Sequence, residues 1–193
     1  SSGAVDALHQ TTNELRFAFD DGGRLRAQVG AFVFDEKVAI TSKSFDTLAP
    51  GRPVNGIATR QNQTDSTGIF ASLAYDITDR LTVSGGARWT DESKVFVVQR
   101  TLGPFGAPPL GPIAGSVSDD QVSWDASATY QATDDINLYA RVAKGFRGPS
   151  TQGRLVFGDT VSSADTETVL SYEAGIKSEL LDNRVRLNAD VFF

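Results

Sequence analysis

The sequence lacks most features that identify a function. Its 193 residues contain no cysteine, which excludes a disulfide framework and a thiolate metal site, and only one histidine. No stretch approaches the roughly 18 apolar residues of a transmembrane helix, and no apolar run follows residues 1–4 as in a secretory signal peptide. The net charge of −6 lacks the basic footprint of a nucleic-acid binder, so no nucleic-acid partner is expected. Methionine is also missing, which predicts an internal piece of a longer chain.

What the sequence has instead is a period of two. Between residues 121 and 130, apolar and polar side chains alternate without interruption, as in Val122, Trp124 and Ala126 against Ser123 and Asp125. Because successive side chains of a strand point to opposite faces, such a run has one apolar and one polar face. The same pattern predicts eight strands, of about ten residues in most cases, at residues 11–20, 24–36, 67–76, 81–98, 121–131, 136–146, 169–180 and 185–193.

The connections between these strands alternate strictly between short and long. The short ones, at 20–23, 77–80, 132–135 and 181–183, carry the Asp, Asn and Gly of tight turns. The long ones, at 37–66, 99–120 and 147–168, are rich in Gly, Pro, Ser and Thr. The chain is therefore predicted to be four antiparallel hairpins joined by three long loops.

Two all-β architectures fit this pattern, and the connections favour one of them. A soluble sandwich or barrel would also have one apolar face, but short turns at one end and long loops at the other are typical of a transmembrane β-barrel. A barrel pairs every backbone group without water. Its polar lumen would hold the charged residues Arg16, Arg88, Arg141, Glu173, Lys177 and Arg186. Its aromatic girdles would include Tyr75, Trp89, Trp124, Tyr130, Phe146 and Tyr172.

The order of the connections also predicts that the barrel is incomplete. If short turns are periplasmic, the first strand begins and the last strand ends at the outer side. A complete barrel normally has both termini in the periplasm, so Phe193 is interpreted as a cut point of a larger barrel.

Several hairpins resemble those of TonB-dependent outer-membrane receptors. The resemblance lies in the segments 170–193 (LSYEAGIKSELLDNRVRLNADVFF), 137–147 (NLYARVAKGFR) and 73–92 (LAYDITDRLTVSGGARWTDE), with 14–17 and 30–36 similar to an earlier hairpin. Together these segments cover nearly all strands, while the long loops match no known pattern.

The resemblance implies a 22-stranded barrel that is closed by an N-terminal plug domain. Such receptors take up iron–siderophore complexes, haem, cobalamin or sugars, driven by the inner-membrane TonB–ExbB–ExbD complex. Residues 1–193 would then be part of the barrel, without the plug and the remaining strands. The expected partners are outer-membrane lipid and lipopolysaccharide, a small ligand such as a metal chelate, and the TonB complex through the missing N-terminal part. Alone, the piece would leave two open strand edges and is not expected to be a functional pore.

No catalytic, cofactor or metal residue is predicted, and the chain is not expected to be an enzyme. His9 is placed ahead of the first strand, so no dyad on a barrel strand has a base. The segment 145–148 lacks the phosphate-binding loop pattern, and the glycosylation acceptor pattern at 62–64 is a chance match in a bacterial protein.

The ligand site itself is left unknown by the sequence. Loop and rim residues are the candidates: arginines for an anionic ligand and aromatics for stacking, namely Arg52, Arg60, Arg100, Arg147, Arg154, Phe105 and Phe157. The competing interpretation, which we favour from the sequence, is that these arginines are solvated or bind lipopolysaccharide at the rim.

Overall fold

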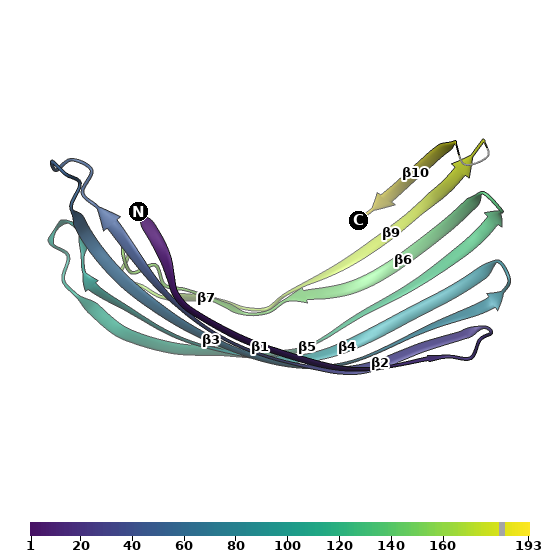
Figure 1. Ribbon diagram of the computed structural model, residues 1–193, viewed down its shortest axis with the longest axis horizontal. Coiled ribbons are helices and arrows are strands. Elements are labelled where there is room, and N and C mark those ends of the chain that lie inside the picture. The colour runs from purple at the N-terminus through teal and green to yellow at the C-terminus, as the bar shows by residue number, and fades with distance from the viewer. Residues whose placement is uncertain (182–183) are drawn as a thin grey trace.

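The protein is one long, curved antiparallel sheet in the computed structural model, which describes residues 1–181 and 184–193 (Figure 1). Eight strands pair in the order β1-β2-β3-β4-β5-β6-β9-β10, and β7 pairs with β8 in a separate two-stranded sheet. The strands are β1 (Ser2–Asp20), β2 (Leu25–Phe45), β3 (Val54–Thr78), β4 (Leu81–Leu102), β5 (Leu110–Thr133), β6 (Ile136–Arg147), β7 (Ser150–Gln152), β8 (Ser162–Ala164), β9 (Glu167–Leu180) and β10 (Val185–Phe192). A single 3-10 turn, η1 (Pro104–Gly106), lies between β4 and β5.

The all-β antiparallel prediction is confirmed, and the sandwich alternative is wrong because the described residues form no second sheet of similar size. Within the described chain, β1 and β10 are edge strands, so the sheet is not closed into a barrel. No helix among residues 1–181 and 184–193 is long and apolar enough to cross a membrane.

The strands are longer than predicted, and two of the three long loops are mostly strand. The first five strands have 19 to 25 residues, so the predicted bounds, which gave them 10 to 18 residues, were too short. The ladder between β2 and β3 continues to Phe45 and Val54, which leaves only residues 46–53 as the loop. Likewise only 103–109 connect β4 and β5. Gly and Pro are concentrated in these short tips, whereas the Thr, Val and Ile around them suit a pleated strand.

The observed strand bounds change the predicted position of His9, but they do not change the separation of the short turns from the longer connections. His9 lies inside β1, opposite Lys37, and not ahead of the first strand. Short turns gather at one end of the sheet and the longer connections at the other (Figure 1). In the first short turn, Gly22 has φ of 69°, which only glycine adopts without strain. Residues 182 and 183 of the last predicted short turn lie outside the described residues.

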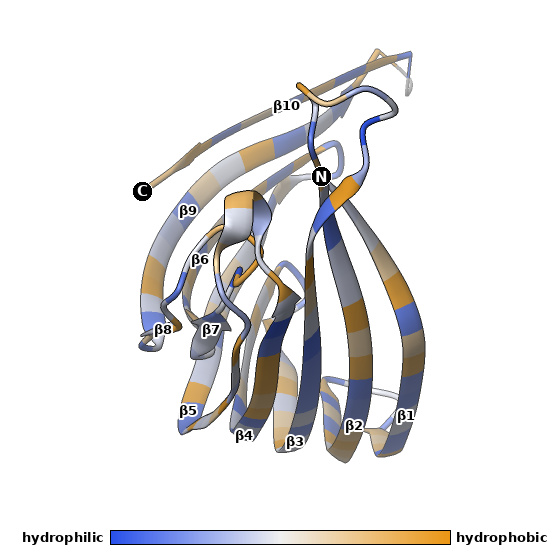
Figure 2. Cartoon of the chain, turned by 90° about the vertical axis from the view of Figure 1, so that its left-hand side faces the viewer, coloured by the Kyte–Doolittle hydropathy of each residue, from blue (hydrophilic) through white to orange (hydrophobic). Residues whose placement is uncertain are grey.

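The strand register aligns the apolar positions into one continuous face. One cross-strand row runs through Leu15, Ala31, Ile69, Trp89 and Val122. Residues paired in an antiparallel ladder point to the same side of the sheet, so the whole row shares a face. The six aromatics predicted for the girdles all belong to this apolar face. Orange and blue alternate along the strands as this arrangement requires (Figure 2).

The opposite face collects the charges. A row next to the previous one runs through Arg16, Gly30, Phe70, Arg88 and Ser123. All six charged residues predicted for a lumen lie on this polar face. The partition of the side chains into two faces is therefore as predicted.

Aromatic rings on the polar face cover glycines of the neighbouring strand. A Cβ added to Gly30 would lie 2.8 Å from the Leu15 carbonyl oxygen and would collide with the Phe70 ring. We expect Gly30→Val to lower the free energy of unfolding by about 1–3 kcal/mol, the usual effect of overpacking. Urea unfolding of the protein measures this loss. Gly145→Val is the matched control, because an added Cβ there meets no atom within 4 Å, and equal losses at both sites would contradict the close approach.

Candidate functional site

The connection between β6 and β9, residues 148–166, folds onto the polar face at the end of the sheet that carries the longer connections. We call it the strap. Its only ladder is internal, between the three-residue strands β7 and β8, with Ser150 opposite Ala164. Side chains, and not a strand ladder, therefore hold the strap against the main sheet.

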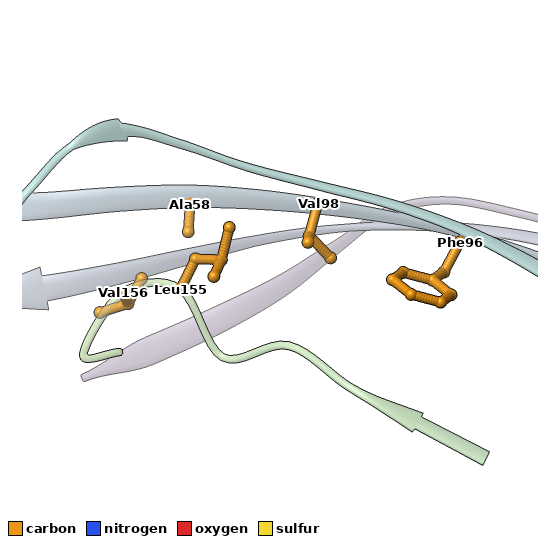
Figure 3. Packing of buried hydrophobic residues seen from close by; sticks show 5 residues of the cluster. All are labelled: Ala58, Phe96, Val98, Leu155 and Val156. Carbon is orange, nitrogen blue, oxygen red and sulfur yellow. The ribbon is translucent and has the colours of Figure 1, made fainter. Parts of the chain in front are cut away.

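A small apolar cluster is the first set of side-chain contacts that holds the strap. Leu155 and Val156 of the strap are 1% exposed, and they pack with Ala58 of β3 and with Phe96 and Val98 of β4 (Figure 3). We call the large sheet the wall. Its residues Ala58, Phe96 and Val98 belong to the same alternate set as the polar-face charges, so the strap covers the polar face. Burial of these two aliphatic side chains stabilises this position by about 3–6 kcal/mol, at about 1.5–3 kcal/mol for each.

Hydrogen bonds from three cations of the wall are the second set of contacts, since each cation donates to a main-chain carbonyl of the strap. Lys94 Nζ lies 2.9 Å from the Pro149 oxygen, Arg60 Nη2 3.0 Å from the Thr151 oxygen, and Arg100 Nη1 3.1 Å from the Leu155 oxygen. Hydrogen bonds with a charged donor are stronger than neutral ones. Because main-chain carbonyls are the acceptors, these hydrogen bonds depend on the backbone conformation of the strap more than on the identity of its side chains.

A carboxylate faces the far end of the strap. The Thr166 hydroxyl and the Gln121 amide lower the pKa of the Asp119 carboxyl, and Gln121 Nε2 lies 2.8 Å from Asp119 Oδ2. A depressed pKa means that this stabilisation is present above the ordinary carboxyl pKa and is lost only as the pH falls through the lower, folded-state value. The hydrogen bond from Gln121 to Asp119 is therefore present across neutral pH, whereas the buried Thr166 hydroxyl has no hydrogen-bond partner within reach among the described residues.

A pocket of about 300 Å³ lies between the wall and the strap. This volume is at the lower end of the range for small-molecule sites. It combines aliphatic and polar residues with two arginines, Arg60 from the wall and Arg154 from the strap. Its lining residues are Ile40, Ser42, Ala58, Thr59, Arg60, Gln152, Gly153, Arg154, Leu155 and Val156.

The two arginines of the pocket retain donors for a ligand. Arg60 uses Nε toward Asn62 and Nη2 toward Thr151. Arg154 uses Nη2 toward Ser1, and its guanidinium lies 5.2 Å from the centre of the Phe157 ring. A guanidinium has five N–H donors in a planar fork that matches carboxylate oxygens. The pocket is therefore suited to an anionic group with an apolar part.

The structure separates the seven candidate residues into three groups. It brings Arg60 and Arg154 together in the pocket, with Phe157 beside Arg154. It buries Arg100 among loop carbonyls, where the guanidinium is not accessible to a ligand. The others are exposed and lie apart from the pocket: Arg52 in the 46–53 loop, Phe105 in η1 and Arg147 at the end of β6.

A second polar-face feature was not anticipated from the sequence. The Arg88 guanidinium lies 5.0 Å from the centre of the Phe32 ring and 5.8 Å from that of Phe70, while Arg16 lies 5.7 Å from Phe70 and pairs with Glu14. Cation–π contacts of this kind order long side chains. The signal was present, because Phe32 and Phe70 are apolar residues in the polar set of their strands.

The described residues show no group of three or more His, Cys, Asp or Glu side chains placed to hold a metal ion. His9 is exposed on β1.

Comparison with known proteins identifies relatives along almost the entire chain. A family model described as "TonB dependent receptor-like, beta-barrel" matches residues 3–193. The pesticin receptor of Yersinia pestis is 32% identical over 126 residues, which are 64% of this chain and 18% of that receptor. The rhizobactin receptor of Rhizobium meliloti is 33% identical over 91 residues, or 42% of this chain and 12% of that receptor. The chain thus spans about a fifth or less of the length of these relatives.

Solved structures agree with this fold. The ferric yersiniabactin uptake receptor FyuA from Yersinia pestis superposes with a TM-score of 0.80 at 25% identity, over 96% of this chain and 28% of FyuA. The siderophore receptor PiuA from Acinetobacter baumannii superposes with a TM-score of 0.66 at 19% identity, over 96% of this chain and 31% of PiuA, and supports the fold alone.

Proposed function

Because the chain belongs to the TonB-dependent receptor β-barrel family, whose members are outer-membrane proteins, we propose that it forms part of the wall of a receptor for energy-coupled uptake of a ferric chelate. The relatives are receptors and not enzymes. The observation that carries the proposal is the pocket between wall and strap, which Arg60 and Arg154 line together with aliphatic and polar side chains. Energy would come from the TonB–ExbB–ExbD complex through a part of the protein that this chain does not contain.

The same proposal includes a larger, 22-stranded barrel with a plug, of which residues 1–193 supply eight adjoining strands. The open sheet supports it, since an edge strand exposed in lipid leaves backbone groups unpaired. So does the coverage of FyuA, of which the chain matches 28%. Outer-membrane lipid would contact the apolar face, and lipopolysaccharide the outer part of the wall.

Uptake of radioactive iron tests the proposal. The receptor carrying this chain is expressed in a strain without its own ferric-chelate receptors, and ferric yersiniabactin is supplied as the first probe, followed by other ferric siderophores. We expect uptake of at least one ferric chelate that falls to the empty-vector level when TonB is deleted. Uptake that persists without TonB would contradict energy coupling, and a receptor that binds no chelate in the series would overturn the ligand class.

A further inference from the structure

Arg100 is a buried cation on the outer part of the wall, where arginines are normally exposed. Its side chain is only 3% exposed. Burial of a charge is unfavourable unless the charge is paired and hydrogen-bonded. Four acceptors meet this requirement: Pro108 oxygen at 3.0 Å from Nε, and Leu155 oxygen, Gly158 oxygen and Asp159 Oδ1 at 3.1, 3.3 and 2.6 Å from Nη1.

These acceptors come from two different connections. Pro108 belongs to the connection between β4 and β5, while the other three belong to the strap. Arg100 itself lies on β4 and is anchored by its ladder, in which it pairs with Ala58 and Leu110. A side chain of the rigid wall thus fixes the relative position of both connections.

The strap depends on this contact because its backbone is not paired with the large sheet. Leu155 follows directly after Arg154 of the pocket, and its carbonyl is one of the Arg100 acceptors. A displacement at Leu155 would carry away Gln152–Val156, which form one side of the pocket. The wall side, from Ile40 to Arg60, would remain in place.

We propose that Arg100 is a positioning residue for the ligand pocket: it holds the strap side of the pocket in place without contacting the ligand. This inference rests on the proposed function. The planar guanidinium is essential to it, since Nε and Nη1 donate to two connections at once. A lysine ammonium retains the charge but places all its donors at one point, so it can serve only one of them.

Two measurements on the receptor carrying this chain test the proposal, and the first needs no ligand. In a Val156→Cys background, maleimide labelling reports release of the strap, because position 156 is 1% exposed. Residues 1–193 contain no other cysteine, and any cysteine elsewhere in the receptor is replaced by serine. We expect Arg100→Gln and Arg100→Lys to accelerate labelling by about tenfold or more, as loss of charge-assisted hydrogen bonds predicts. Hydrogen exchange of residues 150–164 in the receptor without the cysteine provides a second reading.

The second measurement is the affinity for the ferric chelate that the receptor takes up. We expect a loss of about tenfold in both Arg100 variants, and a smaller loss in Asp159→Asn, which keeps the carbonyl contacts. Arg80→Gln is the matched control, because Arg80 is exposed in a short turn at the opposite end of the sheet, and it should change neither value.

The outcomes separate the two proposals. Unchanged labelling and exchange in the Arg100 variants would overturn the positioning role, even in a receptor that takes up ferric chelates. Faster labelling with unchanged affinity would show that the strap does not shape the pocket. If no chelate is taken up, the proposed function fails, while labelling still reports whether Arg100 holds the strap.

Discussion

Ala126→Arg should lower the free energy of unfolding by about 2–4 kcal/mol in lipid, which reduces the ratio of folded to unfolded protein by about 30- to 1000-fold. Ala126 is the middle position of the apolar run on β5, which extends from Val122 to Tyr130, and it is exposed on the apolar face. An arginine there would lie near the centre of the bilayer, where hydration of the guanidinium is lost. Urea unfolding of the receptor in lipid vesicles measures the effect.

Ala143→Arg provides a matched control on the neighbouring strand. Ala143 points to the polar face and lies opposite Asp125 in the register, so an arginine there remains hydrated and gains an acidic neighbour. We expect a change of no more than about 0.5 kcal/mol. Similar losses at 126 and 143 would mean that the apolar face does not contact lipid.

Arg60→Gln combined with Arg154→Gln should weaken binding of the ferric chelate by roughly 10- to 100-fold, the range for loss of one charge-assisted hydrogen bond of about 1.5–3 kcal/mol. Arg60 lines the pocket from the wall and Arg154 lines it from the strap. Glutamine keeps much of the side-chain length and the capacity to donate but removes the charge. The affinity is measured with purified receptor, at low and high salt.

Arg52→Gln controls for the general loss of positive charge at this end. Arg52 is exposed in the 46–53 loop, apart from the residues that line the pocket. We expect its affinity to equal that of the unmodified receptor at physiological salt. If the Arg52 variant loses as much affinity as the double variant, long-range attraction and not the pocket binds the chelate.

The two faces of the sheet could be predicted from the sequence, whereas strand length could not. Alternation depends only on neighbouring side chains, so it separated charges such as Arg88 from aromatics such as Trp89 correctly. Strand ends depend on whether a partner ladder continues. Around Lys43 and Ile57 the composition resembles a loop, yet each strand supplies the other with hydrogen bonds.

The candidate site was predictable residue by residue but not as an arrangement. Arg60 and Arg154 were recognised as candidates because of their charge, but they lie on β3 and on the strap, and only the folded strap brings them together. Like Arg60, Arg100 is an arginine in a predicted long loop, but folding of the strap buries Arg100, so it cannot contact a ligand. Its role depends on distant carbonyls, which carry no signal in residue identity.

On the proposed function, the length of the strands determines how far from the bilayer a ligand is first met. In β3, about 15 residues, Val54–Gly68, lie beyond the apolar positions. At a rise of about 3.3 Å per residue and a tilt of roughly 45°, this part of the wall would stand about 35 Å above the hydrocarbon. In the proposed receptor, a diffusing molecule therefore meets this part of the protein well before it reaches the bilayer. It meets hydrogen-bonded strands there, with the tips at 46–53 and 103–109 and the strap outside the main ladder.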